Sequence, residues 1–257
     1  MGSRLLKSLA IGVSAAAMTL VAYSAAEADY LPVQNLTFST YSGANPKDYF
    51  STVNPSGWYR GTPGVNGDLV FIDAPGTATT TGGGPNSYAV YGPFADPPPG
   101  GNFVQADGNP NYFSTFNQDI TGLVIGQVYT LSFWQAAGQQ VGFTGDTTEQ
   151  WRVFFGSNSA TNFLSNAEYD SPVMSTPSQG VSAWNLVTLE ITAQATSGTL
   201  TFLAWGDGGS TVNLPPTVFL AGVNTPTGAP EPATLSLLGA GLAGIAMRRR
   251  AKRKASA

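Results

Sequence analysis

The sequence predicts an all-β protein whose body is a single antiparallel β-sandwich, and three observations lead to this fold class. Hydrophobic and polar residues alternate with a period of two in several short segments, as in sheets covered on one face. Between Tyr30 and Thr227 no segment shows the sustained helical period of about 3.6 residues. Glycine and proline, at 31 and 18 residues, cluster between the alternating segments, where they favour turns.

Three segments alternate most clearly and are expected to be strands, namely 128–134, 183–193 and 199–205. In the first of them, Tyr129, Leu131 and Phe133 share the face that we expect to be buried. Further strands are expected at 33–40, 68–73, 87–91, 102–107, 112–120, 149–155 and 218–224. About ten short strands joined by turn-rich links of ordinary length are typical of one sandwich.

The composition excludes several classes of chemistry. The chain has no cysteine and no histidine, which excludes disulfide frameworks, thiol nucleophiles, Ser-His-Asp triads and His-ligated metals. Between Asp29 and Ala229 there are three basic and thirteen acidic side chains, a net charge of −10. Because such a body repels phosphates, we expect no nucleic-acid partner.

Residues 1–28 are typical of a secretory signal peptide. Arg4 and Lys7 precede a short apolar run, and Ala26 and Ala28 form an A-x-A cleavage site. The alternative is a permanent membrane anchor, but the apolar run is shorter than the roughly 20 residues that span a bilayer. We therefore expect cleavage after Ala28 and a mature chain outside the cytoplasm.

Residues 229–257 contain a second targeting pattern, in which a proline pair precedes an uncharged segment and a basic cluster. The uncharged segment predicts a helix of about 22 Å at about 1.5 Å per residue, which is short for a membrane span unless the bilayer thins. The positive-inside rule keeps the basic cluster cytoplasmic. The positions of the pattern are Pro230, Glu231 and Pro232, the segment 233–247, and Arg248, Arg249 and Arg250.

This order of features resembles the PEP-CTERM sorting signal over residues 230–254. The resemblance implies that an exosortase-type membrane peptidase processes the protein for export, in Gram-negative bacteria that make extracellular polysaccharide. It also implies transient anchoring in the inner membrane through the C-terminal helix, before a final location in the cell envelope or outside the cell. The alternative is a plain tail anchor that is not cleaved, which does not require the proline pair.

The body shows a second resemblance. The succession of segments 101–108, 116–123 and 126–134 is similar to galactose-binding-like jelly rolls of secreted bacterial proteins and carbohydrate-binding modules. This implies a binding or structural module over residues 29–228, without an enzymatic activity or a required cofactor. One departure is the closing segment 220–223, which lacks the Asp often found there, so any role of that Asp is absent.

Acidic and amide side chains leave two further alternatives open. Without histidine, a glycoside hydrolase or lyase would depend on a pair of carboxylates. Asp107, Asn109 and Asn111 space oxygen ligands two apart, as calcium loops do, and are candidates for a structural Ca²⁺. The other interpretation of these three residues is a turn, because Asp and Asn beside Gly and Pro often bond their own backbone.

Aromatic side chains are the candidates for contact with extracellular polysaccharide, since flat rings and nearby polar groups suit sugars. Trp134 lies in a strongly alternating segment and is expected in the core. The candidates for one glycan surface at the loop end of the sandwich are Trp58, Tyr59, Asp107, Asn109, Trp205 and Asp207. Core packing is the alternative for each ring. The primary hypothesis is a non-enzymatic exported matrix or envelope protein, and the alternative is a carbohydrate-binding module with a defined glycan.

Overall fold

The structure covers most of the predicted sandwich domain. This computed structural model describes residues 29–43, 48–49, 53–63, 69–81, 88–112, 114–156, 167–212 and 214–225. The expected signal peptide with Ala26 and Ala28, and the sorting pattern from Pro230 to Arg250, lie outside the described residues. Within these ranges, no helix has the length and apolar character needed to cross a membrane.

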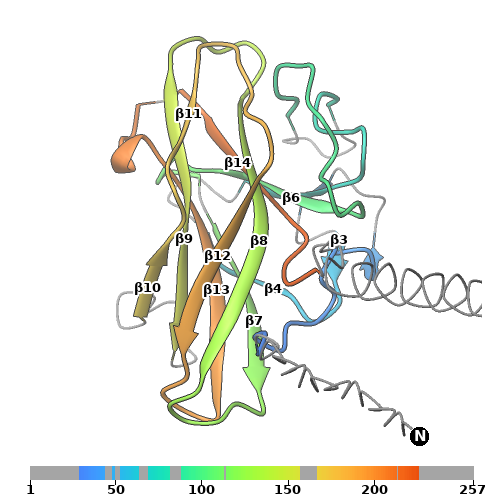
Figure 1. The fold of residues 1–257 in the computed structure, drawn as a ribbon. Helices are drawn as coiled ribbons and strands as arrows, with labels where there is room; N and C mark the ends of the chain where they lie inside the picture. Colours follow the sequence, from blue (N-terminus) through green and yellow to red (C-terminus); the bar gives the residue numbers. More distant parts are fainter. Residues whose placement is uncertain are drawn as a thin grey trace, which may run out of the picture.

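The described strands form two six-stranded antiparallel sheets that lie face to face (Figure 1). The first, here called the β14 sheet, contains β12 (Asn185–Thr192), β8 (Val128–Gln139), β14 (Pro216–Ala221), β6 (Phe103–Asp107), β5 (Val70–Asp73) and β2 (Asp48–Tyr49), in that order. The second, the β13 sheet, contains β10 (Ala167–Asp170), β9 (Thr147–Gly156), β13 (Ser197–Gly206), β7 (Ser114–Thr121) and β4 (Tyr59–Pro63), and β11 (Met174–Thr176) also pairs with β9. A separate two-stranded ribbon pairs β1 (Tyr41–Gly43) with β3 (Val53–Pro55). The predicted all-β antiparallel sandwich is confirmed.

The main core lies between the two sheets and contains the residues that alternate in the sequence. On β8, Tyr129 and Phe133 are buried on the inner face. β12 pairs with β8 so that Val187 lies opposite Phe133 and Ile191 lies opposite Tyr129. All four side chains belong to the same buried cluster, and removing such apolar surface from water is the main source of folding stability.

An aromatic cluster fills the centre of this core. The ring of Trp151 on β9 is fully buried and meets Phe116 and Phe202 edge-on, with ring centroids 5.8 Å and 6.0 Å away. The indole Nε1 of Trp151 donates a hydrogen bond of 2.9 Å to the carbonyl oxygen of Phe219 on β14. This bond joins the two sheets through the middle of the core and satisfies the buried donor.

The outer face of the β14 sheet carries a second apolar layer. Phe71, Phe103 and Phe219 lie in a buried cluster separate from the main core. Two residues from the segment after β5 cover them: Tyr88 packs edge-on against Phe71 at 5.6 Å, and Phe94 lies 4.5 Å from Phe219. The β14 sheet is therefore buried on both faces over part of its length.

Trp134 and Trp184 lie at the margin of this outer layer, and both are half-buried. Trp184 packs edge-on against Phe103 at 5.9 Å, and its Nε1 donates to the carbonyl oxygen of Ala95 at 2.8 Å. Trp134 therefore does not lie in the main core as expected, because its position on β8 points it away from the space between the sheets and toward the outer layer.

Two expected strands do not form. Residues 33–40 make turns, with Asn35 and Phe38 at φ values of 51° and 52°. The side chain of Asn35 accepts a hydrogen bond from the amide of Thr40 and donates one to the carbonyl oxygen of Thr40. These two bonds close a turn where a strand was expected to pair with a neighbouring strand. In the segment expected at 87–91, the described residues contribute an isolated bridge between Val90 and Gln140.

Candidate functional site

Asp107, Asn109 and Asn111 form two successive turns closed by side-chain oxygens. The amide of Asn109 donates to Asp107 Oδ1 at 2.7 Å, and the amide of Asn111 donates to Asn109 Oδ1 at 2.9 Å. Asp107 and Asn109 are both buried, whereas Asn111 is half-buried. This geometry is that of the turn interpretation, and within the described residues no group of three or more Asp or Glu side chains gathers as metal ligands.

Close backbone contact brings the Trp205–Asp207 segment against this turn. The amide of Gly206 donates to the carbonyl oxygen of Gly108 at 3.0 Å. A Cβ on Gly108 would lie 2.7 Å from the Gly206 nitrogen, so a larger residue does not fit there. Asp107, Asn109, Trp205 and Asp207 therefore share one end of the sandwich.

The side chains at this end nevertheless point to different faces. Asp107 lies beside Tyr88, which packs on the outer face of the β14 sheet. Trp205 lies on the outer face of the β13 sheet, because its neighbour Ala204 is the one that enters the core. Burial raises the pKa of Asp107 to about 7, against the hydrogen bond from Asn109, which lowers it. Asp107 therefore stabilises the fold at this end of the sandwich and does not contribute to a glycan-binding surface.

Trp58 is a core residue, which corrects the expectation that it is exposed. Its exposed fraction is 5%, and its ring lies 5.3 Å from Phe38 and 5.2 Å from Phe116. The turn from Pro55 to Trp58 directs the indole inward, where Nε1 donates to the carbonyl oxygen of Gln34 at 3.1 Å. The glycines around it indicate a turn, but they do not determine which way the side chain points.

Tyr59 lies away from the Trp205 end, on β4 opposite Asn117 of β7. Its hydroxyl donates to Asp119 Oδ1 at 2.8 Å, and the hydroxyl of Thr199 donates to the same oxygen at 2.8 Å. Burial and the Asp119 carboxylate raise the pKa of Tyr59 to about 12. The six predicted glycan candidates therefore do not form one surface.

The Trp205 face is the arrangement that has the chemistry of a binding site. It comprises Thr148, Gln150 and Arg152 of β9, Trp205 of β13, and Asp207 of the short 3-10 helix η2 (Asp207–Gly209). Trp205 pairs in register with Gln150, and the guanidinium carbon of Arg152 lies 4.6 Å from the centre of its ring. The amide of Thr148 donates to Asp207 Oδ1 at 2.8 Å, which holds η2 against β9.

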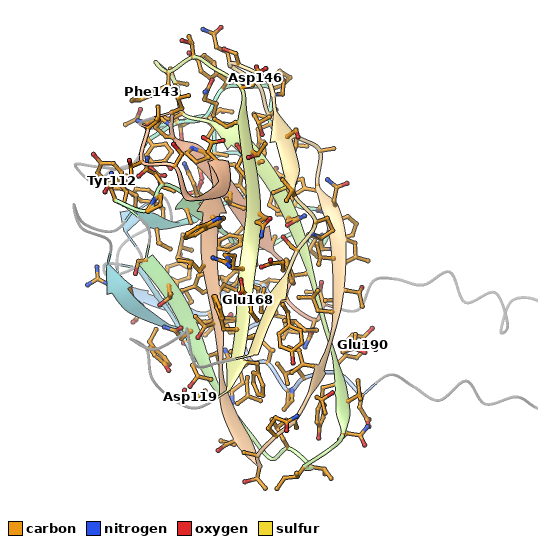
Figure 2. All side chains as sticks on the ribbon, turned by 90° about the vertical axis from the view of Figure 1, so that its left-hand side faces the viewer. Tyr112, Asp119, Phe143, Asp146, Glu168 and Glu190 are labelled. Carbon is orange, nitrogen blue, oxygen red and sulfur yellow. The ribbon has the colours of Figure 1, made fainter. Side chains whose placement is uncertain are left out.

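A hollow of about 240 Å³ opens beside the Trp205 ring. Its walls are Trp205, Arg152, Gln150 and Thr148, together with Glu149, Val173 and Gly208. A second hollow of about 370 Å³ adjoins it at Thr148 and is lined by the segments 146–148 and 175–177. Figure 2 looks onto this side of the molecule, with Asp146 toward one end and Asp119 toward the other.

Glu149 lies beneath the Trp205 face and is fully buried. The hydroxyl of Thr147 donates to Glu149 Oε1, and the hydroxyl of Thr176 donates to Oε2 at 2.9 Å. Burial raises the pKa of Glu149 to about 7, these two hydroxyls oppose the rise, and the charge of Asp207 adds to it. The carboxyl group therefore ties β11 to β9.

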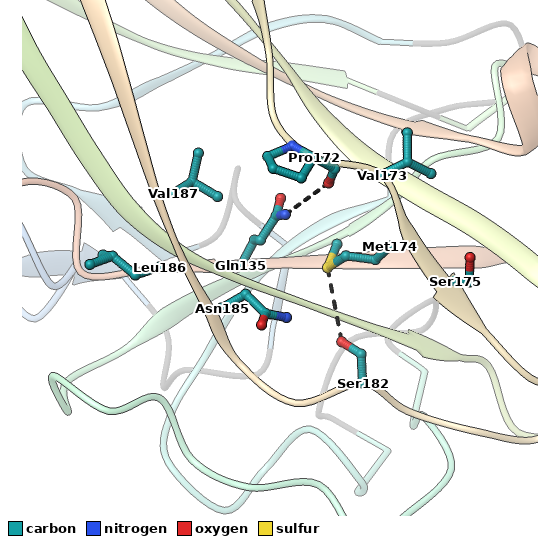
Figure 3. A pocket seen from close by; sticks show the side chains of 9 residues that line it. All are labelled: Gln135, Pro172, Val173, Met174, Ser175, Ser182, Asn185, Leu186 and Val187. Atoms are coloured by element: carbon teal, nitrogen blue, oxygen red, sulfur yellow. Dashed lines mark hydrogen bonds between the residues drawn. The ribbon is translucent and has the colours of Figure 1, made fainter.

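A third hollow, of about 490 Å³, lies between β12 and β11 at the edge of the sandwich (Figure 3). Gln135 at its base donates from Nε2 to the carbonyl oxygen of Pro172 at 2.9 Å and accepts from Ser171 at 2.6 Å. Met174 and Val187 are buried in its walls, and Leu186 is exposed at the rim. The polar base is thus internally satisfied, and the hollow lacks the aromatic wall of the Trp205 face.

Sequence reasoning identified Trp205 and Asp207 but missed Thr148, Gln150 and Arg152. Alternation along β9 places these three side chains on one face, since Trp151 and Val153 are buried on the other. This alternation along residues 147–156 could have been recognised from the sequence. The contact with Trp205 additionally requires the register between β9 and β13, which no local pattern contains.

Comparison with protein families identifies the C-terminal segment. Residues 229–250 match the family model described as the PEP-CTERM protein-sorting motif. The sorting motif expected from Pro230, Glu231, Pro232 and the arginine cluster is confirmed at these residues. No curated protein matches the chain.

Solved structures with similar folds are distant in sequence. The K1 cleaved adhesin domain of Lys-gingipain from Porphyromonas gingivalis W83 is 13% identical over 73% of this chain and 93% of that one, with a TM-score of 0.37. The CBM22-2 xylan-binding domain of Paenibacillus barcinonensis Xyn10C is 10% identical over 68% and 94%, also with a TM-score of 0.37. The enzymatically active domain of bacteriophage CBA120 tailspike protein 4 is 15% identical over 71% of this chain, with a TM-score of 0.38, and the match spans 21% of the tailspike chain. Likeness at this level says nothing about what this chain binds.

Proposed function

We propose that this chain is an exported, non-enzymatic protein of the cell envelope or extracellular matrix that binds polysaccharide at the Trp205 face. The match of residues 229–250 to the PEP-CTERM sorting motif is the observation that carries the export and sorting part. The motif begins four residues after Thr225, where the described sandwich ends. An exosortase-type peptidase is the proposed partner at the inner membrane, acting on the segment around Pro230, Glu231 and Pro232.

The glycan part rests on the chemistry of the Trp205 face. The half-buried indole forms one wall of the hollow, and Thr148, Gln150 and Arg152 bring hydroxyl, amide and guanidinium groups to its sides. An apolar wall with a few convergent polar groups suits a sugar ring, whose faces are apolar and whose edge carries hydroxyls. The glycan is proposed to lie beside the ring, because Arg152 already occupies a position over it.

Sorting is tested by intact-mass measurement on protein recovered outside the inner membrane of a producing cell. The expected mature chain lacks Arg248, Arg249 and Arg250, and Glu231→Ala leaves unprocessed chain in the inner membrane. A secreted chain that still ends at Ala257 contradicts the proposal. A Glu190→Ala variant is the matched control, because it removes an exposed carboxylate within the sandwich.

Glycan binding is tested separately with the polysaccharide of the producing organism. Retention of the native protein in a gel containing that polysaccharide, and loss of retention in Trp205→Ala, are the expected results. Release of reducing ends from the polysaccharide would instead support the alternative of a carboxylate-dependent hydrolase. In that case Glu149→Gln should abolish the release, since Glu149 lines this hollow and Asp207 is close enough to raise its pKa.

A further inference from the structure

The turn that joins β7 to β8 carries an exposed group of apolar side chains, here called the apolar tip. It consists of Val124, Ile125, Val128 and Tyr30, with exposed fractions of 63%, 64%, 46% and 48%. The amide of Gln127 donates to the carbonyl oxygen of Val124 at 3.0 Å, so Val124 and Ile125 occupy a tight turn and project from it. Tyr30 bridges to Thr130, which lies two residues from Val128 on the same face of β8. Exposed apolar side chains that gather at one turn are candidates for an interaction surface.

The apolar tip lies near the point where the chain leaves the sandwich toward the sorting motif. Asn224 donates from Nδ2 to the carbonyl oxygen of Leu31 at 2.6 Å, and its Oδ1 accepts from the amide of Ser132 at 2.7 Å. Ser132 is four residues from Val128 along β8, which is about 13 Å. The four residues from Thr225 to the start of the motif extend over about 14 Å at most. A motif held in a membrane therefore keeps this end of the sandwich within reach of the lipid surface.

From this arrangement we infer that the apolar tip inserts into the surface of the bilayer while the C-terminal motif is anchored. The inference rests on the proposed sorting through that motif. The charged groups that the structure places beside the tip are the carboxylates of Asp29, which accepts from Gln127, and Glu190, which lies opposite Thr130. Acidic neighbours do not attract anionic lipid, so the contact depends on aliphatic side chains entering the headgroup region. Val212, with an exposed fraction of 60%, lies in the loop after η2, which follows the end of β13 remote from the β7–β8 turn, and it is expected to stay in water.

The absence of cysteine from the chain allows a direct test. Ile125→Cys, Val212→Cys and Ala257→Cys are made in the full-length protein, and each is labelled with an environment-sensitive fluorophore. The labelled proteins are mixed with phosphatidylcholine vesicles that contain a nitroxide-labelled lipid as quencher. The melting temperature of each variant is compared with that of the native protein, and exposed positions 125 and 212 are expected to leave it unchanged.

The expected result is a blue shift and at least a twofold quenching at position 125, with neither change at position 212. Addition of Val124→Asp to the Ile125→Cys protein should remove both changes at position 125. The same substitution in the Ala257→Cys protein should leave the signal from the tail intact. Membrane signals at position 257 without any at position 125 overturn the inference and leave the sorting proposal standing. Signals at neither position count against both proposals. Equal signals at 125 and 212 also overturn the inference, because they indicate adsorption without orientation.

Discussion

The guanidinium carbon of Arg152 lies 4.6 Å from the centre of the Trp205 ring, although 53 residues separate the two in the sequence. The same guanidinium donates from Nε to Glu168 Oε1 at 2.5 Å, and Asp170 lies 3.7 Å from Nε. The two carboxylates of β10 therefore hold Arg152 over the indole. A ring held on a sheet in this way needs little further ordering when a ligand binds, which favours affinity.

Trp205→Ala should separate binding from stability. Replacement removes the apolar wall of the hollow, and we expect polysaccharide affinity to fall about tenfold, which is about 1.4 kcal/mol. Loss of the cation–π contact at this half-exposed position should cost about 0.5–1 kcal/mol of stability. Affinity electrophoresis and thermal melting measure the two effects. Trp184→Ala, which removes a ring from the outer layer of the β14 sheet, is the control, and it should keep the affinity.

Trp58→Ala should show the opposite behaviour. The buried indole packs among Phe38, Phe116 and Phe202, and truncation of a buried Trp costs about 3–5 kcal/mol. Trp58→Phe should cost less, because it keeps most of the packing and loses the bond to Gln34. Chemical denaturation measures both variants. A Trp58→Ala protein with the melting temperature of the native protein would contradict the core position of Trp58 and make it a candidate for glycan contact again.

Glu149→Gln should stabilise the protein at high pH. The pKa of Glu149 is about 7 in the folded state and 4.5 unperturbed, so the folded protein binds the proton more tightly than the unfolded chain. Its contribution is most favourable below pH 4.5, decreases as the pH rises to 7, and is then constant. The whole change is about 3 kcal/mol. Melting curves should show Glu149→Gln above the native protein at pH 8, with the difference vanishing toward pH 4.

Asp107 should respond to substitution according to its role in the turn. Asp107→Asn keeps an oxygen for the amide of Asn109 and removes a carboxyl group whose pKa burial raises to about 7, so it should be at least as stable as the native protein at pH 8. Asp107→Ala leaves that amide without its acceptor and should lose about 1–3 kcal/mol. Denaturation at pH 8 compares them. Equal stability of the two variants would show that the hydrogen bond from the amide of Asn109 to Asp107 does not stabilise the protein.

A structural calcium ion at Asp107, Asn109 and Asn111 remains a prediction from the spacing of these residues. An ion bound there would raise the melting temperature of the native protein by mass action, and would raise that of Asp107→Asn less. If these residues form only the observed turns, in which Asp107 and Asn109 each direct one oxygen at a backbone amide, the melting temperature does not change on adding calcium or chelator. A calcium-dependent rise in the native protein alone would establish the ion.

Local alternation predicted the strands that are covered on one face. Segments 128–134 and 199–205 lie within β8 and β13, and β12 lies within segment 183–193. Phe133 enters the core as expected. The outer layer of the β14 sheet was not predicted, because its cover comes from the segment after β5, which has no periodic pattern. Residues 33–40 alternate enough to suggest a strand, but the side chain of Asn35 offers the backbone a competing turn.

The candidate site was predicted only in part for a related reason. Trp205 and Asp207 stand out by residue type, whereas Arg152 acquires its role through the pairing of β9 with β13. Trp58 and Trp205 both follow or precede glycines, yet one enters the core and the other lies on a sheet surface. Which way a turn directs a side chain depends on the tertiary contacts that close around it.

The strand that comes last in the described chain, β14, occupies an interior position of its sheet between β8 and β6. A chain that crosses a membrane with its N-terminus first presents β6 and β8 before the strand that must pair with both. Until Pro216–Ala221 has emerged, each of these two strands has an unpaired edge, and the indole of Trp151 has no carbonyl of Phe219 to meet. Completion of the sandwich therefore waits until β14 has crossed, and long-range pairing of this kind is slow to form. Escorting factors that shield unpaired edges during this interval should affect the yield of exported protein more than its final stability.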